Sequence, residues 1–495
     1  MKKQILFRAL CGLLAFSMLF SFTGCNKGND ESEETSTIEI WEDDSSNAGG
    51  SGNSNSGGGT SQGAASDGKT SGGKNNSSTV KVDNSEGEKL QPIGNPYGSI
   101  PSDVKGSTVK FATWIDHKSN VETAQVIKNF ESKTGIKVEI VNVAQNGYMT
   151  KLVSMIASNK APDVFVDNME FPVSLKIAQP VNNYINSKDS VWSKSHMKYG
   201  TINGKIYVVN GENVCWNFVN GLFFNKKVAE ENGIKTPYDY RDENNWNWDT
   251  MRQYMKDYTS IPGEYYGGYI AVDELAKSAG TSLVKYNNGT FSSGIGDSNL
   301  TKAIQVYADI KKNGYMMDST HHVYLKNGAQ GLFTGTSWQL MRSAINWRDT
   351  GEDEVRFDID NFGFIEYPGP KGGKAYAPQN TRGYGICKGS SNPKGAGYFL
   401  RWFLDGTNYD FDTVYKKPAV AKEMINRVKA ANNKNGYYLD PTQNCMTLVN
   451  EKLYSTTIGE LKEVDTAQVA AVLSQKSGVC NNAAKKANNL IKSSK

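Results

Sequence analysis

The sequence predicts an α/β fold in which helices cover an open, mostly parallel sheet. From residue 108 onward, short apolar or alternating runs are separated by segments of helical periodicity, in the order strand, helix, strand, helix, strand. Polar or aromatic residues follow each of the first three strands, and ligands of such sheets bind beyond the carboxyl ends of the strands. A chain of 495 residues is longer than one hydrophobic core usually serves, so we expect more than one folded unit.

The spacing of apolar residues defines the first elements. Residues 108–114, 137–142 and 162–167 predict strands. Residues 121–133 have helical spacing and stop at Thr134-Gly135, and a second helix is predicted over 148–159. The segments that follow the three strands are 114–117, 143–146 and 167–170, and we expect them to face one crevice.

Later elements are predicted in the same way. Residues 212–218 indicate a crossing between folded units. Asp249 or Thr250 is expected to cap a helix that carries Met251 and Tyr254 on its apolar face. Further helices are expected over 300–312 and 395–404, and the tail from residue 418 is predicted to be mostly helical.

The N-terminus has the pattern of an export signal. A positive start, an apolar run and small residues before Cys25 resemble a bacterial lipobox, in which the cysteine carries the lipid. We therefore expect a signal peptide over 1–24 and a lipid anchor, such as palmitate, on Cys25, with an ordinary secretory signal as the alternative. The Ser/Gly/Asn-rich residues 25–106 predict a disordered tether that reaches about 45 Å. The folded part is thus expected outside the cytoplasm, held at a membrane.

Composition narrows the function classes. Lys and Arg number 55 against 51 Asp and Glu, and no basic run interleaves with aromatics, which disfavours nucleic acid as a partner. Four His residues offer little material for metal or acid–base chemistry. The cysteines beyond Cys25 are far apart, which disfavours zinc, and leaves disulfides and buried free thiols both open: Cys215, Cys387, Cys445 and Cys480.

The order of several short motifs resembles the extracellular solute-binding proteins of carbohydrate importers, the family of maltose-binding proteins. The matching segments include 130–140, 156–164, 204–207, 223–226, 233–237, 331–338, 367–370 and 391–399. The resemblance implies a two-lobed, type II periplasmic-binding-protein fold with ligand between the lobes. By order, lobe one takes 107–214 and 384–435, and lobe two takes 217–380 and 440–495. It also places Cys215 and Cys387 near neighbouring crossings, where a disulfide could stiffen the hinge.

The resemblance also indicates which residues face the ligand. Trp338 corresponds to an aromatic residue that stacks on sugar in related proteins, and core packing is its alternative role. Asp167 and Asn168 follow the third strand, where the family often places a hydroxyl-binding group. The other candidates adjoin strand ends or crossings, with packing or loop roles as alternatives: Trp114, Asp116, Gln145, Glu212, Trp216, Arg382 and Tyr384.

These features predict a surface lipoprotein that captures a sugar and delivers it to the permease of an ABC transporter. We expect a monomer that needs no cofactor or metal, although Lys and Arg near the cleft could suit an anionic solute. A surface-displayed glycan receptor or adhesin without import is the alternative, and a glycan-active enzyme is a weaker one. The chain lacks the common hydrolase motifs, and neither His321-His322 nor 358–361 has a supporting ligand set.

Overall fold

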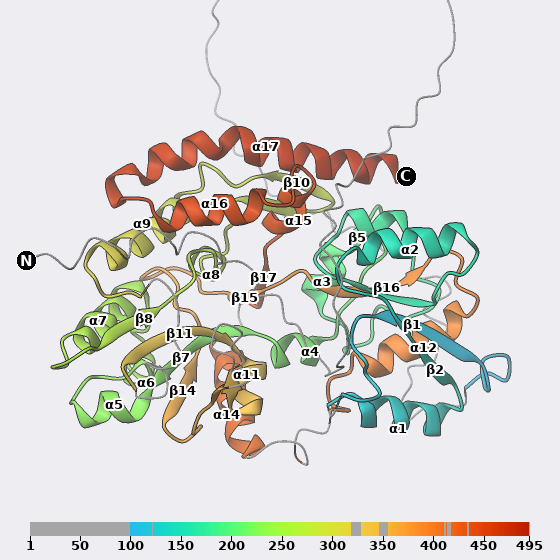
Figure 1. Cartoon of the computed structure of the whole chain (residues 1–495), viewed down its shortest axis with the longest axis horizontal. Coiled ribbons are helices and arrows are strands. Elements are labelled where there is room, and N and C mark those ends of the chain that lie inside the picture. Colours follow the sequence, from blue (N-terminus) through green and yellow to red (C-terminus); the bar gives the residue numbers. More distant parts are fainter. Residues whose placement is uncertain are drawn as a thin grey trace, which may run out of the picture. The chain divides into compact units, whose positions relative to one another are not determined.

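A computed structural model describes residues 100–494 apart from 121, 318–327, 346–354, 410–411, 413–416 and 433–434. The predicted signal peptide, the lipid site at Cys25, nearly all of the tether and the His321-His322 pair lie outside these residues. The described chain folds around two β-sheets, each covered by helices (Figure 1). The prediction of a two-lobed α/β fold is therefore confirmed, and we call the parts built on the two sheets lobe one and lobe two.

Lobe one contains a five-stranded sheet in the order β2-β1-β3-β16-β4. Strand β1 pairs in parallel with both β2 and β3, whereas β16 runs antiparallel to β3 and β4. Its strands are β1 (Thr108–Thr113), β2 (Lys137–Asn142), β3 (Val164–Asp167), β4 (Ala178–Gln179) and β16 (Gly383–Cys387). Around them lie α1 (Ala124–Thr134), α2 (Tyr148–Ala157), η2 (Val173–Lys176), α3 (Lys194–Tyr199), β5 (Thr201–Ile202), β6 (Lys205–Ile206) and α12 (Pro393–Phe403).

Lobe two contains a four-stranded sheet in the order β14-β7-β11-β8. Its strands are β7 (Asn220–Asn225), β8 (Tyr266–Tyr269), β11 (Gln330–Thr336) and β14 (Phe362–Ile365). The accompanying elements are α5 (Lys226–Glu231), α6 (Pro237–Asp242), α7 (Trp248–Thr259), α8 (Val272–Ser278), β9 (Val284–Asn287), β10 (Thr290–Ser293), α9 (Ser298–Lys312), α11 (Ser337–Arg342), β12 (Ala344–Ile345) and β13 (Val355–Arg356).

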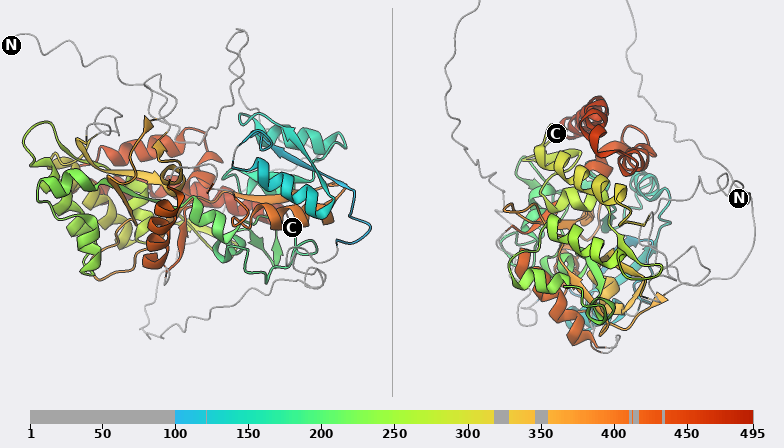
Figure 2. Two further views of the ribbon diagram at one scale, coloured as in Figure 1. Left: turned by 90° about the horizontal axis from the view of Figure 1, so that it is seen from below. Right: turned by 90° about the vertical axis from the view of Figure 1, so that its left-hand side faces the viewer.

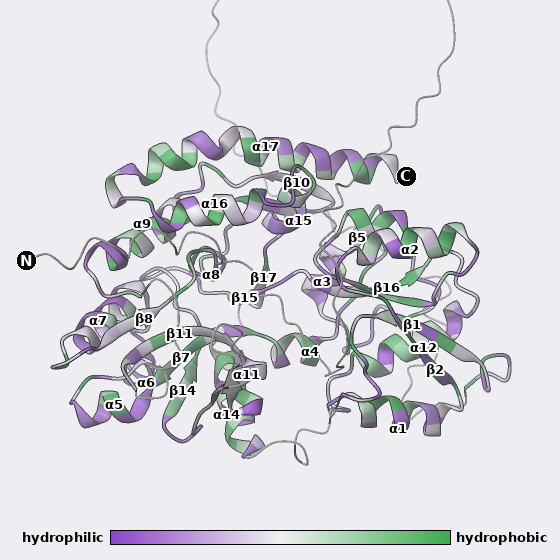
Figure 3. Ribbon diagram, viewed as in Figure 1, coloured by the Kyte–Doolittle hydropathy of each residue, from purple (hydrophilic) through white to green (hydrophobic). Residues whose placement is uncertain are grey.

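The apolar pattern of each element explains its burial. Figure 3 shows β7, β14 and β16 largely in hydrophobic colours, and every residue of β3 and β14 is buried. Helix α12 turns Phe399 and Phe403 toward β1, where both rings lie within 5.5 Å of the Phe111 ring. Burial of such aromatic side chains contributes roughly 2–3 kcal/mol each, so α12 is a main source of stability for lobe one.

The structure adds detail to one local prediction and corrects another. The crossing at 212–218 is mostly the short helix α4 (Glu212–Asn217), in which the backbone N–H of Cys215 bonds to the carbonyl of Gly211. Helix α7 is capped by Asn247, whose side chain accepts from the N–H groups of Asp249 and Thr250. The Thr250 hydroxyl accepts the Asn247 N–H in return, which completes a capping box.

The predicted boundary of lobe one at residue 435 lies too far along the chain. Helix α14 (Pro418–Asn432) packs against β14 and α11, so it belongs with lobe two (Figures 1 and 2). Its buried face presents Ala421, Ile425 and Val428. The helical period of this segment is evident in the sequence, but the period does not state which sheet receives the apolar face.

The C-terminal tail packs mainly on lobe two. It comprises β17 (Tyr437–Leu439), α15 (Thr442–Thr447), α16 (Leu453–Lys462), η3 (Thr466–Gln468) and α17 (Val469–Ser493), and β17 pairs in parallel with β15 (Ala377–Gln379). Helix α17 lies along β10, α15 and α9 (Figure 1). Of the described helices, none is long and apolar enough to cross a membrane.

The tail and the β9–β10 hairpin also contact lobe one. The Tyr286 ring lies 4.9 Å from the Tyr199 ring, and its hydroxyl donates to the carbonyl of Thr201. The buried Asn444 side chain donates to the carbonyl of Phe171 and accepts from the hydroxyl of Thr381. These contacts join the two lobes through residues other than the chain crossings themselves.

Candidate functional site

The strand register of lobe one gathers several predicted residues at one edge. Gly383 of β16 lies opposite Asp167 of β3, so Arg382 and Asn168 are placed side by side at the end of the antiparallel pair. Arg382 Nη2 donates to Asn168 Oδ1 at 2.7 Å. The guanidinium carbon of Arg382 also lies 5.6 Å from the ring centroid of Trp114, which follows β1. Three of the predicted residues therefore form one contiguous group, and we call these three together with the neighbouring Asp167 and Glu170 the strand-end cluster.

Trp114 is positioned by an aromatic neighbour. Its ring meets Tyr148 edge-on at 5.1 Å, and the Tyr148 hydroxyl is fixed because it donates to the carbonyl of Ala112 and accepts from the N–H of Val166. The indole Nε1 is buried, and within the described part of the chain it has no hydrogen-bond partner. A buried donor without a partner is costly, so a ligand that accepts this N–H would gain binding free energy.

Asp167 is fully buried in this cluster. Among the described residues, neither carboxyl oxygen has a partner of good hydrogen-bond geometry, although the Ser174 hydroxyl and the Glu170 backbone lie nearby. Burial raises the pKa of Asp167 to about 8, and burial raises the pKa of Glu170 to about 7. Burial also lowers the pKa of Arg382. At neutral pH Asp167 is therefore largely protonated and Glu170 is about half protonated, beside a charged guanidinium.

The turn after β3 is held in an uncommon conformation. Met169, between Asn168 and Glu170, has φ of 62°, in the left-handed region. A bulky residue rarely adopts this conformation, and the cost is on the order of 1–3 kcal/mol. On either side of Met169, the Asn168 side chain accepts from Arg382 and the Glu170 side chain is half-buried.

Three predicted residues lie apart from the strand-end cluster or are engaged elsewhere. The Tyr384 ring packs 6.2 Å from Phe111 and 5.9 Å from Phe403, toward the lobe-one core. Asp116 is exposed and accepts from the backbone N–H of Lys118, so it shapes its own turn. Gln145 is half-buried in the loop before α2, where its backbone carbonyl accepts the N–H of Tyr148.

The residues predicted at the first crossing contact one another. Trp216 Nε1 donates to Glu212 Oε1 at 3.0 Å, one helical turn apart in α4. The Tyr437 hydroxyl donates to the same carboxylate at 3.2 Å, and its ring lies 4.6 Å from the Trp216 ring. Trp216 is only 5% exposed. In this conformation the pair joins the crossing to β17.

Trp338 lies at the start of α11, in lobe two, and only 4% of it is exposed. One face of the indole stacks on Phe218 at 4.7 Å, and the Arg342 guanidinium lies 5.5 Å from the ring centroid. Arg342 Nη2 in turn donates to Glu122 of lobe one at 2.7 Å, and the Glu122 carboxylate is fully buried. In this conformation, stacking of a sugar on Trp338 requires Phe218 or Arg342 to move.

Several residues of the site were missed in the sequence. Glu170 could have been found, because it lies only three residues beyond Asp167 in the same strand-end segment. Tyr437, Glu122 and Arg342 carry no local signal, because each reaches the site through a partner more than 200 residues away.

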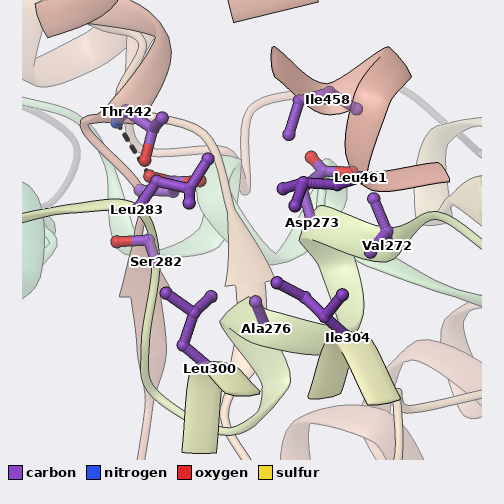
Figure 4. A pocket seen from close by; sticks show the side chains of 11 residues that line it. Val272, Asp273, Ala276, Ser282, Leu283, Leu300, Ile304, Thr442, Ile458 and Leu461 are labelled. Atoms are coloured by element: carbon purple, nitrogen blue, oxygen red, sulfur yellow. Dashed lines mark hydrogen bonds between the residues drawn. The ribbon is translucent and has the colours of Figure 1, made fainter. Parts of the chain in front are cut away.

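A separate small cavity lies inside lobe two (Figure 4). The centre of a water molecule can move within about 10 Å³ of it, so the cavity has room for roughly one water. Leu283, Leu300, Ile304 and Leu461 line it from several elements, so it is a packing gap rather than a solute site. Within the described residues, no cluster of His, Cys, Asp and Glu is suited to hold a metal ion.

The predicted hinge disulfide is wrong for this structure. Cys215 and Cys387 are both free and buried, as are Cys445 and Cys480. Cys215 Sγ lies 3.4 Å from His196 Nδ1, whereas Cys387 is within the core of lobe one. The two thiols therefore lie in different parts of the structure.

Two sheet-based lobes, joined by crossings that carry polar and aromatic side chains, define the architecture of a solute receptor. The sequence model of the bacterial extracellular solute-binding proteins matches residues 125–435, and the chain belongs to this family. The diacetylchitobiose-binding protein DasA of Streptomyces coelicolor is 24% identical over 314 residues, which cover 61% of this chain and 64% of the relative. The chain thus spans slightly less than two thirds of that relative.

Solved structures share the fold at low sequence identity. The galacto-N-biose/lacto-N-biose I-binding protein of Bifidobacterium longum, in complex with lacto-N-biose, has a TM-score of 0.54 at 13% identity. The alignment covers 79% of this chain and 98% of that protein. An extracellular solute-binding protein of Staphylococcus aureus in complex with maltose has a TM-score of 0.51 at 16% identity, with 78% and 97% covered. These likenesses concern the fold.

Proposed function

We propose that the protein is the substrate-binding component of an ABC importer and that its solute is a sugar or short oligosaccharide. The strand-end cluster is the observation that carries this proposal. It combines an aromatic ring, an amide, a guanidinium and a buried carboxyl at the edge of a sheet where α/β proteins bind ligands. A related protein binds diacetylchitobiose, and fold neighbours bind maltose and lacto-N-biose.

The role of each lobe follows from this placement. Lobe one would supply Trp114, Asn168, Asp167 and Arg382 for the polar edge of a sugar ring, with Trp338 of lobe two as the stacking partner. Closing the lobes excludes water and forms the surface that a permease recognises. These roles require only that the solute is bound and released, so we propose a receptor without catalytic activity. A lipid on Cys25 and the tether up to residue 106 would hold it at the membrane, and we propose that it works as a monomer.

The test is calorimetric titration of the exported chain carrying Cys25→Ala against a panel of mono- and disaccharides that includes diacetylchitobiose. We expect saturable binding and chemically unchanged sugar. Trp114→Phe should weaken binding about tenfold, because it removes the buried N–H and part of the aromatic face. Trp246→Phe is the matched control, since Trp246 is also half-buried but bonds to Glu366 in lobe two.

Each other outcome has a distinct meaning. Absence of heat with every sugar contradicts the carbohydrate assignment. Binding that Trp114→Phe and Trp246→Phe affect equally contradicts the placement of the site. Hydrolysed sugar would establish an enzyme, and preference for long insoluble polymer over short sugar would establish a surface glycan receptor.

A further inference from the structure

Arg382 differs from the other arginines of the described chain in its lack of an acidic partner. Each of the other five arginines whose side chains are described has a carboxylate oxygen within 4.0 Å: Arg241, Arg252, Arg342, Arg401 and Arg427. Among these described groups, no carboxylate comes that close to Arg382. Its direct partners are the amide oxygen of Asn168 and the ring of Trp114, both of which are uncharged.

The missing counter-charge is costly because the Arg382 guanidinium cannot lose its charge. A guanidinium stays protonated in proteins, so burial cannot make it neutral. Arg382 Nε is shielded from solvent and, within the described chain, has no hydrogen-bond acceptor. A buried and unpaired charge is among the most unfavourable arrangements in a protein interior. A structural arginine at this position would be expected to have a carboxylate beside it, as the other arginines do.

Asp167 is the nearest candidate for a counter-charge, and it does not fill the role. Its carboxyl group lies more than 4.0 Å from the guanidinium, since no ion pair forms between them, and it is fully buried. Burial outweighs the nearby Ser174 hydroxyl, the Glu170 backbone and the charge of Arg382, and it raises the pKa of Asp167 to about 8. Glu170, whose burial raises its pKa to about 7, is not an ion-pair partner either. At neutral pH Asp167 is largely protonated and Glu170 is about half ionised, so the charge of Arg382 is only partly offset.

The unpartnered atoms are suited to an anion. Trp114 Nε1 and Arg382 Nε are both buried donors without acceptors in the described chain, and they belong to side chains that contact each other. A protonated Asp167 adds an O–H donor. Planar carboxylates match the fork of an arginine, and charge-assisted hydrogen bonds of this kind are roughly twice as strong as neutral ones. Neighbouring buried donors without acceptors suit an anion, which only accepts, better than a hydroxyl group, which also donates.

We propose that the solute carries a carboxylate, as in a sugar acid of the uronic type, and that Arg382 is the residue that pairs with it. This inference rests on the proposed function, because it assigns a ligand class to the same site. Arg382 contacts the solute directly, while Asn168 is a positioning residue that holds the guanidinium through its 2.7 Å hydrogen bond. The Trp114 ring packs against the sugar and its N–H donates to the same carboxylate.

The binding test compares sugars that differ only in charge. The exported Cys25→Ala protein is titrated with glucuronate against glucose, and with digalacturonate against α-1,4-galactobiose. We expect at least one acid to bind more than about 100-fold tighter than its neutral counterpart. Arg382→Gln should remove that preference, and Arg382→Lys should keep part of it. Arg427→Gln is the matched control, because Arg427 is exposed and pairs with Glu423 at 2.6 Å on α14.

A second measurement does not depend on the choice of sugar. Sodium acetate, compared with sodium chloride at the same ionic strength, should raise the melting temperature of the wild-type protein and of Arg427→Gln. It should leave Arg382→Gln unchanged. Equal effects of acetate on all three proteins would overturn the proposal, because the buried guanidinium would then have no need for a carboxylate.

Different results would contradict the acidic-solute proposal and the sugar-receptor function. Tight binding of neutral sugars that Arg382→Gln leaves intact overturns the acidic-solute proposal and supports the sugar-receptor function. Binding of neither acidic nor neutral sugar counts against the function, and the acetate experiment then decides whether Arg382 is an anion site.

Discussion

Replacing Asp167 by Asn should make the protein markedly more stable at high pH relative to low pH. In the folded state burial raises the pKa of Asp167 from 3.8 to about 8. The folded protein therefore retains a proton that the unfolded chain has released, and wild-type stability falls as the pH rises through that window. Below 3.8 both states are protonated, and above about 8 both have lost the proton, so this residue adds no further change there.

The size of the effect follows from the width of the window. Each pH unit inside it changes the free energy of unfolding by about 1.4 kcal/mol. Between about pH 5 and pH 8 the wild-type protein should thus lose at most about 4 kcal/mol through Asp167, and local relaxation or entry of water reduces this value. Asn has nearly the same shape and does not ionise, so Asp167→Asn removes this loss.

The assay is urea unfolding of wild type and variant at both pH values, followed by circular dichroism. The difference in stability, variant minus wild type, should become more favourable by 2–4 kcal/mol, roughly, as the pH rises. Asp163→Asn, just before the other end of β3, is a suitable control. The Asp163 carboxylate accepts from Lys110 N, Ser390 Oγ and Asn392 N, so its loss should destabilise the protein at both pH values. A constant difference for Asp167→Asn would refute the reasoning.

Three further predictions concern contacts that join distant parts of the chain. Arg342→Ala leaves the buried Glu122 carboxylate without its guanidinium, so the free energy of unfolding measured in urea should fall by about 3 kcal/mol. The double variant Glu122→Gln, Arg342→Gln should lose clearly less, and equal losses would mean that the pair is not coupled. Tyr437→Phe removes a hydroxyl that donates to Glu212 and should cost about 1 kcal/mol, and unchanged stability would show that this bond contributes nothing in solution. In the exported Cys25→Ala protein the buried thiols should react slowly with a thiol reagent while the protein is folded. After unfolding without a reductant the reagent should titrate four thiols, and fewer than four would reveal a disulfide. The four are Cys215, Cys387, Cys445 and Cys480.

The sequence was most informative where local pattern alone determines structure. The strand predicted over 137–142 coincides with β2 (Lys137–Asn142), and the helix predicted over 300–312 corresponds to α9 (Ser298–Lys312). Both segments carry a local apolar pattern, and each buries its apolar residues within its own lobe. Element type could therefore be predicted with little knowledge of the rest of the molecule.

Long-range placement could not be predicted in this way. The apolar stripe of α14 would suit either sheet, and only its packing against β14 and α11 assigns it to lobe two. The surroundings of Trp338 depend on Phe218 and on Arg342, which is held by Glu122 from the other lobe. The strand-end cluster was partly predictable, since Trp114, Asp167 and Asn168 lie at strand ends. The absence of a carboxylate within 4.0 Å of Arg382 among the described residues depends on how distant segments pack and has no local signal in the sequence.

The position of β16 between β3 and β4 has a consequence for how the protein folds. Because the strand order is β2-β1-β3-β16-β4, the sheet of lobe one stays incomplete until residues 383–387 join it. The closing segment must return across roughly 215 residues, at an entropic cost of about 5 kcal/mol before any contact is gained. Such remote pairing slows folding. When the chain is synthesised from its N-terminus, the edges of β3 and β4 thus stay unpaired until most of lobe two has also been made.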